Sequence, residues 1–308
     1  PATRLQLPQR DLVSAPVAEP APVAPAERWP KALSASAVET WRDCPYRFFA
    51  QRVLGLGSDD ELDRMAEKRD YGDWLHAVLH HFHQARGAEP VPAEDAARLR
   101  ASAQAVAADP RLGEGEMLPF LASFETLVEP YLAWLHAREA AGWRYEAGEV
   151  TREVSPAVLG GLQLRGRLDR VDTGPGSARQ VLDYKTGRSD ALKQKVKSPL
   201  EDTQLAFYAL LMAGEDGVPP AGLGAAYLAL DEREAPVEVP HADVADHAQT
   251  LLAALADEFD RARAGEPLRA LGRGPACEHC DMRGLCRRDH WAAPPDEAAE
   301  AATEGAGR

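Results

Sequence analysis

The strongest chemical signal in the sequence lies in two short stretches, Gly166-Arg167-Leu168-Asp169-Arg170 and Val181-Leu182-Asp183-Tyr184-Lys185-Thr186-Gly187. Asp169 lies near the end of one predicted strand, and Asp183 and Lys185 lie at the end of the next. Because side chains alternate along a strand with a period of two, Asp183 and Lys185 project from one face. If the two strands form a hairpin, Asp169 can approach Asp183.

Two carboxylates that face one point favour a bound cation. Asp169 and Asp183 would repel each other unless a cation lay between them. Carboxylate oxygens suit Mg²⁺ or Mn²⁺, and a lysine such as Lys185 can orient a water molecule or neutralise charge at a phosphate. The alternative is a solvated salt bridge at the strand ends. The apolar pair Val181-Leu182 favours the site, since ligands bind at the carboxyl ends of buried strands.

These motifs resemble the active site of the PD-(D/E)XK nuclease superfamily. The flanking residues are similar to its RecB-like branch, and most closely to the AddB-type iron–sulfur nuclease domain. Gly72-Asp73-Trp74-Leu75-His76 resembles the upstream Gly-x-x-x-His of that branch, and Gln204-Leu205-Ala206-Phe207-Tyr208 resembles its Gln-x-x-x-Tyr helix. The resemblance covers residues 34–290. It implies a restriction-endonuclease-like fold, in which helices flank a central mixed sheet, with a helical N-terminal region and a C-terminal iron–sulfur staple.

The resemblance also implies roles for individual residues. It assigns Mg²⁺ or Mn²⁺ ligation to His76, Asp169, Asp183 and the carbonyl of Tyr184. It assigns catalysis to Asp169, Asp183 and Lys185, with Gln204 and Tyr208 organising the site from one face of a helix.

The histidines around residue 80 do not indicate a zinc protease. His76 and His80 have the spacing of a zinc pair, but residue 77 is alanine, so the glutamate of that motif is absent. We expect His80 and His83 to be packing or surface residues.

The four cysteines form one candidate cluster. Cys277, Cys280 and Cys286 have the spacing Cys-x2-Cys-x5-Cys, and Cys44 lies 233 positions before Cys277. Four thiolates satisfy either a tetrahedral Zn²⁺ or a [4Fe–4S] cluster, and spacing alone leaves both open, beside the possibility of unrelated buried cysteines. The AddB-type resemblance, carried by the segment 41–49, implies the iron–sulfur cluster, with one cysteine before the nuclease core and three after it.

Charge is unevenly distributed along the chain. The net charge of -14 argues against a protein that coats nucleic acid passively. Locally, residues 161–199 hold nine Lys or Arg against four Asp or Glu, whereas residues 201–265 hold three against 13. The segregation favours a DNA-facing side, although the lysines could instead form a solvated loop. We expect DNA contacts from Arg167, Arg170, Lys193, Lys195 and Lys197.

The order of the predicted elements indicates an α/β class. Hydrophobic periodicity predicts strands over 149–158, 162–172, 180–184 and 224–230, and helices over 36–54, 71–84, 96–108, 118–140, 201–212 and 244–264, with a break at Pro45.

Composition predicts three regions. They are a Pro/Ala-rich linker (1–33), a nuclease domain closed by the four cysteines (34–290, with a helical part 71–145 and a catalytic core 149–232) and a disordered tail (291–308). No apolar run is long enough to span a membrane, the start does not resemble a signal peptide, and four cysteines are too few for a disulfide scaffold.

These observations predict a Mg²⁺- or Mn²⁺-dependent DNA exonuclease of end processing, recombination or repair, in the cytoplasm at the nucleoid. No ATPase phosphate-binding loop appears, so a helicase subunit or an upstream helicase-like domain is the expected partner. The Pro-rich start and the absent initiator Met favour a piece of such a subunit. The alternatives are a free-standing exonuclease similar to those of CRISPR adaptation, a non-catalytic DNA-binding module of the same fold, and a zinc-stapled scaffold for a protein partner.

Overall fold

The computed structural model describes residues 16–57, 68–87, 91–107, 118–199, 201–214, 216–230 and 235–291. The first 15 residues of the predicted linker, and all but the first residue of the predicted tail, lie outside the described residues. None of the described helices is long and apolar enough to cross a membrane.

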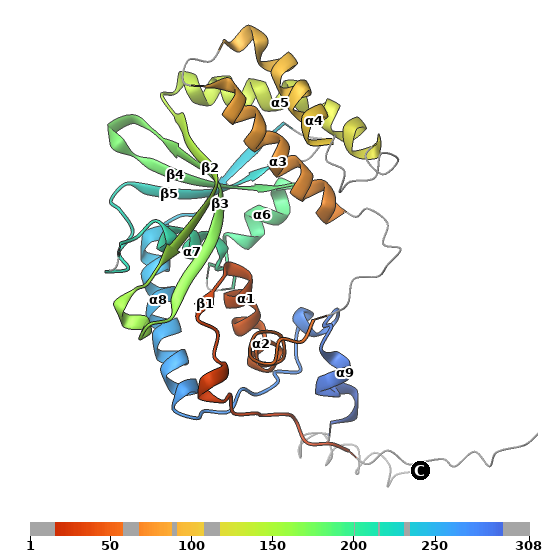
Figure 1. Cartoon of the computed structure of the whole chain (residues 1–308), viewed down its shortest axis with the longest axis vertical. Helices are drawn as coiled ribbons and strands as arrows, with labels where there is room; N and C mark the ends of the chain where they lie inside the picture. The colour runs from red at the N-terminus through yellow and green to blue at the C-terminus, as the bar shows by residue number, and fades with distance from the viewer. Residues whose placement is uncertain are drawn as a thin grey trace, which may run out of the picture.

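A six-stranded mixed sheet forms the centre of the molecule (Figure 1). Its path is β1-β3-β4-β5-β6, and β2 pairs with β3 off this path. The strands are β1 (Ala32–Leu33), β2 (Arg144–Val154), β3 (Gln163–Thr173), β4 (Arg179–Lys185), β5 (Leu223–Ala229) and β6 (Val237–Pro240). The α/β class and the central mixed sheet are therefore confirmed.

The two motif strands are hairpin partners, as the sequence predicts. β3 and β4 pair antiparallel, with Arg170 opposite Leu182. β4 then pairs in parallel with β5. Such a pair needs a crossover, here supplied by α6 (Ser189–Lys195) and α7 (Gln204–Leu211). Asp183 and Lys185 consequently lie at the carboxyl end of a strand in the middle of the sheet.

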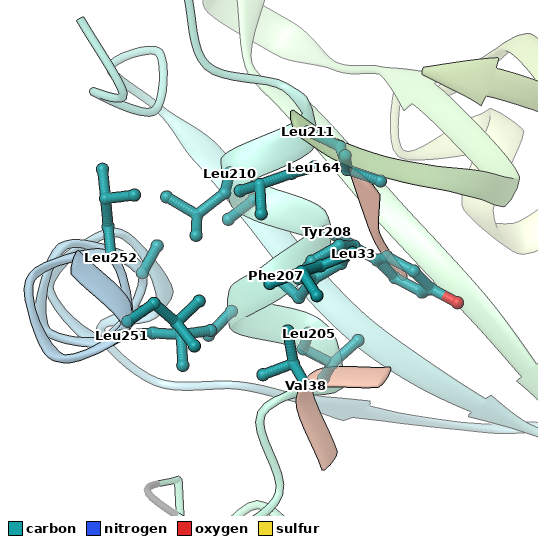
Figure 2. Packing of buried hydrophobic residues seen from close by; sticks show 14 of the residues in the cluster. Leu33, Val38, Leu164, Leu205, Phe207, Tyr208, Leu210, Leu211, Leu251 and Leu252 are labelled. Atoms are coloured by element: carbon teal, nitrogen blue, oxygen red, sulfur yellow. The ribbon is translucent and has the colours of Figure 1, made fainter. Parts of the chain in front are cut away.

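Helices cover both faces of the sheet (Figure 1). On one face lie α3 (Lys68–Arg86), α4 (Asp95–Ala107) and α5 (Leu118–Ala140), whose apolar residues form one buried cluster with Tyr184. On the other face α7 and α8 (Val244–Arg263) form a second, larger cluster. Figure 2 shows side chains of α7 packed among Leu33, Val38 and Leu164 and the α8 residues Leu251 and Leu252.

The N-terminal helices follow the prediction except at their start. α1 (Ala35–Asp43) begins one residue before the predicted Ser36, because Ser34 is the N-cap and its side chain accepts a hydrogen bond from the Ala37 N–H at 3.2 Å. The predicted break at Pro45 is confirmed: α1 ends at Asp43, Cys44 is extended, and Pro45 opens α2 (Pro45–Phe48).

Short elements complete the described chain. They are a π-helical turn (Phe49–Val53), α9 (Arg283–Cys286) and 3-10 turns at Ala26–Arg28, Pro92–Glu94, Ala157–Leu159, Pro175–Ser177, Pro275–Cys277 and Arg288–His290. The sheet also exceeds the predicted catalytic core, because β1 and β6 come from outside residues 149–232.

Candidate active site

Three metal-ligating side chains meet at the edge of the sheet. His76 from α3, Glu149 from β2 and Asp169 from β3 place one ligand atom each within 4.8 Å of one another, and they are the one such group among the described residues. The Nδ1 atom of His76 lies 3.5 Å from an Asp169 carboxylate oxygen and 3.9 Å from Glu149 Oε1. Glu149 Oε1 is buried and has no hydrogen-bond partner among the described residues, as expected of a carboxylate oxygen that binds a cation.

The backbone of Tyr184 joins this group. Its N–H donates to Asp169 Oδ2 at 2.9 Å, and its carbonyl oxygen lies 3.1 Å from His76 Nε2. Both ring nitrogens of His76 therefore face acceptors, which suits an imidazolium. The charge of a protonated His76 compensates the nearby carboxylates, a role that a bound divalent cation would also fill.

Lys185 and Asp183 form a pair beside the group. The Nζ atom of Lys185 lies 2.7 Å from Asp183 Oδ2, and the carboxylate of Asp183 is 2 % exposed. The side-chain amide of Gln204 donates to Asp183 Oδ1 at 2.9 Å and also lies 2.9 Å from the hydroxyl of Tyr208. Gln204 and Tyr208 thus reach Asp183 from the first turn of α7, on the side of the sheet opposite α3.

The electrostatics of the site favour protonated acids when no metal is bound. Burial, followed by the charge of Asp169, raises the pKa of Asp183 to about 6, although Lys185 and His76 oppose the shift. Burial and Asp169 also raise the pKa of Glu149. Burial alone would lower the pKa of His76, but its contact with Asp169 and the charges of Asp169, Asp183 and Glu149 outweigh burial and raise it.

We therefore expect metal affinity to increase with pH. The ligating forms are the neutral imidazole and the ionised carboxylates. A divalent cation must therefore displace protons from His76, Glu149 and Asp183, whose pKa values are all raised. With a pKa of about 6, Asp183 alone should make Mn²⁺ binding about tenfold weaker at pH 5 than at pH 7. Titration calorimetry with Mn²⁺ at both pH values measures this. Equal affinities, with no proton release, would contradict the assignment.

Glu149 is the site residue that the sequence analysis missed. The sequence predicts Glu149 only as the first residue of a strand over 149–158, whereas β2 runs from Arg144 to Val154. Glu149 lies on β2 between Gly148 and Val150, which pair with Arg170 and Leu168, so it is opposite Asp169 of β3; its backbone has a left-handed φ of 51°. This conformation is uncommon for a non-glycine residue and occurs where a site requires it.

The neighbouring Gly148 shows how closely the two strands approach. A Cβ atom at this position would lie 2.9 Å from the carbonyl oxygen of Asp169. Only glycine permits this approach, which places Glu149 beside Asp169. The sequence signal that could have identified Glu149 is the glycine directly before it, at the start of a predicted strand.

The predicted DNA-contacting residues divide into exposed and buried groups. Arg167 is exposed and forms a 2.8 Å ion pair with Glu149. Lys193, Lys195 and Lys197 are exposed on and just after α6.

The prediction for Arg170 was wrong. Its side chain is 1 % exposed, it pairs with Asp172 at 2.7 Å, and it points toward α3 and α5, where it contacts His83 and Tyr131. His83 is itself buried, as expected of a packing residue.

The four cysteines line one small, largely enclosed cavity. Cys44 comes from the junction of α1 and α2, and Cys277, Cys280 and Cys286 come from the segment around α9. None forms a disulfide. Burial, which is the largest effect, raises the thiol pKa of Cys277 and Cys286. No three of the four thiols lie within 4.8 Å of one another, unlike the ligand atoms of His76, Glu149 and Asp169.

The described segments around this cavity hold each other in place. The Tyr46 N–H donates to the carbonyl of Arg269 at 3.3 Å, and Arg47 and Gln51 contact Asp281 at 3.4 and 3.0 Å. The two ends of the domain therefore meet here.

Fold and site together define a mixed α/β protein with a candidate divalent-metal site at the edge of its sheet. The model of the PD-(D/E)XK nuclease superfamily matches residues 32–287. The chain belongs to this superfamily.

Two solved structures are similar to the chain. One is the "Putative exonuclease" from Eubacterium rectale, with 14% identity, 86% of this chain and 90% of that chain covered, and a TM-score of 0.43. The other is SSO0001, with 14% identity, 83% and 85% covered, and a TM-score of 0.31. A search of curated proteins finds no match.

Proposed function

We propose that the protein is a metal-dependent DNA nuclease that hydrolyses phosphodiester bonds as an exonuclease. The observation that carries this proposal is the convergence at one sheet edge of His76, Glu149 and Asp169 with the Asp183–Lys185 pair. Membership of the nuclease superfamily supports it. Within the superfamily we assign the chain to the RecB-like branch, with roles in DNA end processing, recombination or repair.

The residues present fit a hard divalent cation. The unpartnered Glu149 Oε1, the Asp169 carboxylate and the His76 ring are ligands that Mg²⁺ and Mn²⁺ accept. Asp183 and the Tyr184 carbonyl, which lies 3.1 Å from His76 Nε2, complete the set that we propose. When bound, a divalent metal supplies Lewis-acid stabilisation of negative charge on the phosphate.

The chain's own residues then position the reactants. The ammonium group of Lys185, held by Asp183, can donate hydrogen bonds to a phosphate oxygen or to the attacking water. Gln204 fixes the other oxygen of Asp183 and so limits how the carboxylate can turn. Lys185 Nζ lies over the ring of Tyr227, 5.5 Å from its centroid, and this cation–π contact restrains the lysine. The Tyr227 hydroxyl in turn donates a 2.7 Å hydrogen bond to Asp202.

Cleavage of end-labelled DNA tests this function. Single strands and duplexes, labelled at the 5′ or the 3′ end, should be degraded in Mn²⁺ with mononucleotide or short products from one end. Asp183→Asn protein purified in parallel should be inactive, which excludes a contaminating nuclease. Binding of DNA without any cleavage would instead support the non-catalytic module.

We further propose that the four cysteines hold a structural [4Fe–4S] cluster. Their common cavity and free thiols support the proposal. Zinc–thiolate bonds of about 2.3 Å in a tetrahedron would bring the sulfur atoms to within about 4 Å of one another. Among the described residues no three thiols lie within 4.8 Å of each other, so their spacing does not match a preformed zinc tetrahedron.

Cys44→Ser should release the iron and destabilise the fold. The cluster would close a loop of more than two hundred residues, and the chain-entropy model assigns such a closure about 5 kcal/mol. We expect anaerobically prepared wild-type protein to be brown, with absorbance near ~400 nm, and the variant to be colourless with a lower urea midpoint. A colourless wild-type preparation loaded with zinc would contradict the cluster.

We propose that residues 34–290 form the nuclease domain; the predicted linker ends earlier than residue 33, because β1 (Ala32–Leu33) pairs with β3 and Leu33 is buried in the core. As partner we propose a helicase subunit or a helicase-like domain, at whose side the nuclease would degrade unwound DNA at the nucleoid. Co-purification of the untagged helicase with a tagged chain, retained in nuclease-treated extract, tests this. Its absence would favour the free-standing exonuclease.

A further inference from the structure

A basic groove begins beside the candidate metal site. The groove has a volume of about 390 Å³ and runs between the β2–β3 ribbon and the β1–α1 segment. Its cationic lining consists of Arg52, Arg165 and Arg167, with Ser34 and Thr151 as the hydroxyl groups. In the part of the chain that the structure describes, no carboxylate lines it. Such a lining suits a polyanion.

The pleat of β3 aligns the groove with the site. Every second residue of a strand lies on the same face, so Arg165, Arg167 and Asp169 lie in one row, about 6.8 Å apart from one to the next. Across the ribbon Thr151 is paired with Arg167. The Nε atom of Arg167 contacts Glu149 Oε2 at 2.8 Å, so the groove is continuous with the metal-ligating group.

The arginines are available for a ligand. The side chains of Arg165 and Arg167 are 64 % and 66 % exposed. Arg165 lies 3.9 Å from Glu153, an exposed contact of little energetic value that a phosphate could replace. Arg52 is exposed, and among the described residues it donates one long hydrogen bond, of 3.4 Å, to the Ser36 hydroxyl.

A second hollow near Lys185 has the opposite character. It is lined by Glu39, Asp43, Glu201 and Asp202, and Lys195 is the one cation among the described lining residues. Four carboxylates would repel a phosphate backbone. The charge of the two surfaces therefore directs a nucleic-acid strand along the arginine groove.

We propose that the groove binds the sugar–phosphate backbone of the substrate strand next to the phosphodiester that is cleaved. This inference rests on the proposed nuclease function and extends it. Arg165 and Arg52 contact successive phosphates, and Ser34 and Thr151 donate hydrogen bonds to them. Because contacts to phosphates carry no sequence information directly, this binding is independent of sequence.

The salt dependence of binding tests the groove without requiring catalysis. Anisotropy of a labelled 20-nucleotide single-stranded DNA is measured in EDTA over a KCl series, for wild type and for Arg52→Ala/Arg165→Ala. Each lost contact should reduce the slope of log K against log [KCl] by about 0.7. Two contacts therefore correspond to a slope change of about 1.4 and an affinity loss of about tenfold at 0.15 M salt.

Arg152→Ala is the matched control. Arg152 is an exposed arginine on β2, the residue after Thr151, and the pleat directs it to the other face. Its slope should equal that of wild type, and Arg52→Lys/Arg165→Lys, which retains both charges, should keep most of the slope. A double-alanine slope equal to that of Arg152→Ala would overturn the groove.

The test separates this inference from the proposed function. If the wild type cleaves DNA but the double-alanine variant keeps the wild-type slope, only the groove is wrong. If the slope falls as expected but the wild type cleaves nothing in Mn²⁺, the groove stands as a nucleic-acid site and the nuclease function is wrong.

Discussion

Lys185→Ala is expected to lower the rate of DNA cleavage by about 10²–10³-fold while leaving the fold intact, as for the loss of one preorganised donor at a charged transition state. The Lys185 side chain is 30 % exposed, so its removal leaves no large cavity in the core. The reacting phosphate would lose a donor, and Asp183 would lose the cation 2.7 Å from its carboxylate.

The loss of the cation beside Asp183 should change the pH dependence of cleavage, which a simple loss of packing would not do. Lys185 lowers the pKa of Asp183, which burial and Asp169 raise to about 6. Without the lysine this pKa should increase further, and the residual activity should rise with pH over a higher range than in wild type. Single-turnover cleavage in Mn²⁺ between pH 5.5 and 9 measures both effects. Undiminished cleavage, or the same pH profile at reduced rate, would contradict the role of Lys185.

Asp172→Asn is expected to destabilise the protein by about 3–5 kcal/mol, the usual cost of breaking a buried ion pair on one side. Asp172 is fully buried, and its two oxygens bind Arg170 at 2.7 Å and Arg138 at 2.6 Å. Arg138 retains a second partner, Glu238, at 2.8 Å. Arg170 makes no other ion pair among the described residues, so the substitution leaves a buried guanidinium without a counter-ion.

Equilibrium unfolding in urea measures this loss. Asp190→Asn is the matched control, because Asp190 pairs with Lys193 at 3.1 Å on the surface, where both side chains are more than half exposed. Such a pair contributes at most about 1 kcal/mol. If Asp172→Asn were no more destabilising than Asp190→Asn, the buried network would not be what attaches α5 to the sheet.

The sequence predicted the parts of the fold that follow simple periodicity. The hairpin of β3 and β4, the helix over Leu118–Ala140 and the end of α1 before Pro45 were found as predicted. The short strands β1 and β6 and the helix α6 were missed, because two to seven residues carry too little pattern to be recognised.

The site was predictable only where chemistry and periodicity agreed. Asp183 and Lys185 follow an apolar strand, and the structure brings them together. Glu149 was missed because a left-handed residue inside a strand has no periodic signature. Arg170 was predicted to face DNA but is buried. Leu168 and Val171 both pack in the larger core although they are three residues apart, so strict alternation fails between them and could not have placed Arg170. Both irregularities lie beside Asp169, where the chain departs from regular strand geometry to build the site.

The most direct test of the central claim is the Mn²⁺ dependence of DNA cleavage by wild-type and Asp169→Asn protein. Asp169 contacts both His76 and the Tyr184 N–H, and asparagine preserves its shape while removing its charge. We predict no cleavage in EDTA, saturable cleavage as Mn²⁺ is added to wild type, and none with the variant at the same concentrations. Wild-type protein that cleaves no DNA at any Mn²⁺ concentration, or a variant that cleaves as fast as wild type, would contradict the account.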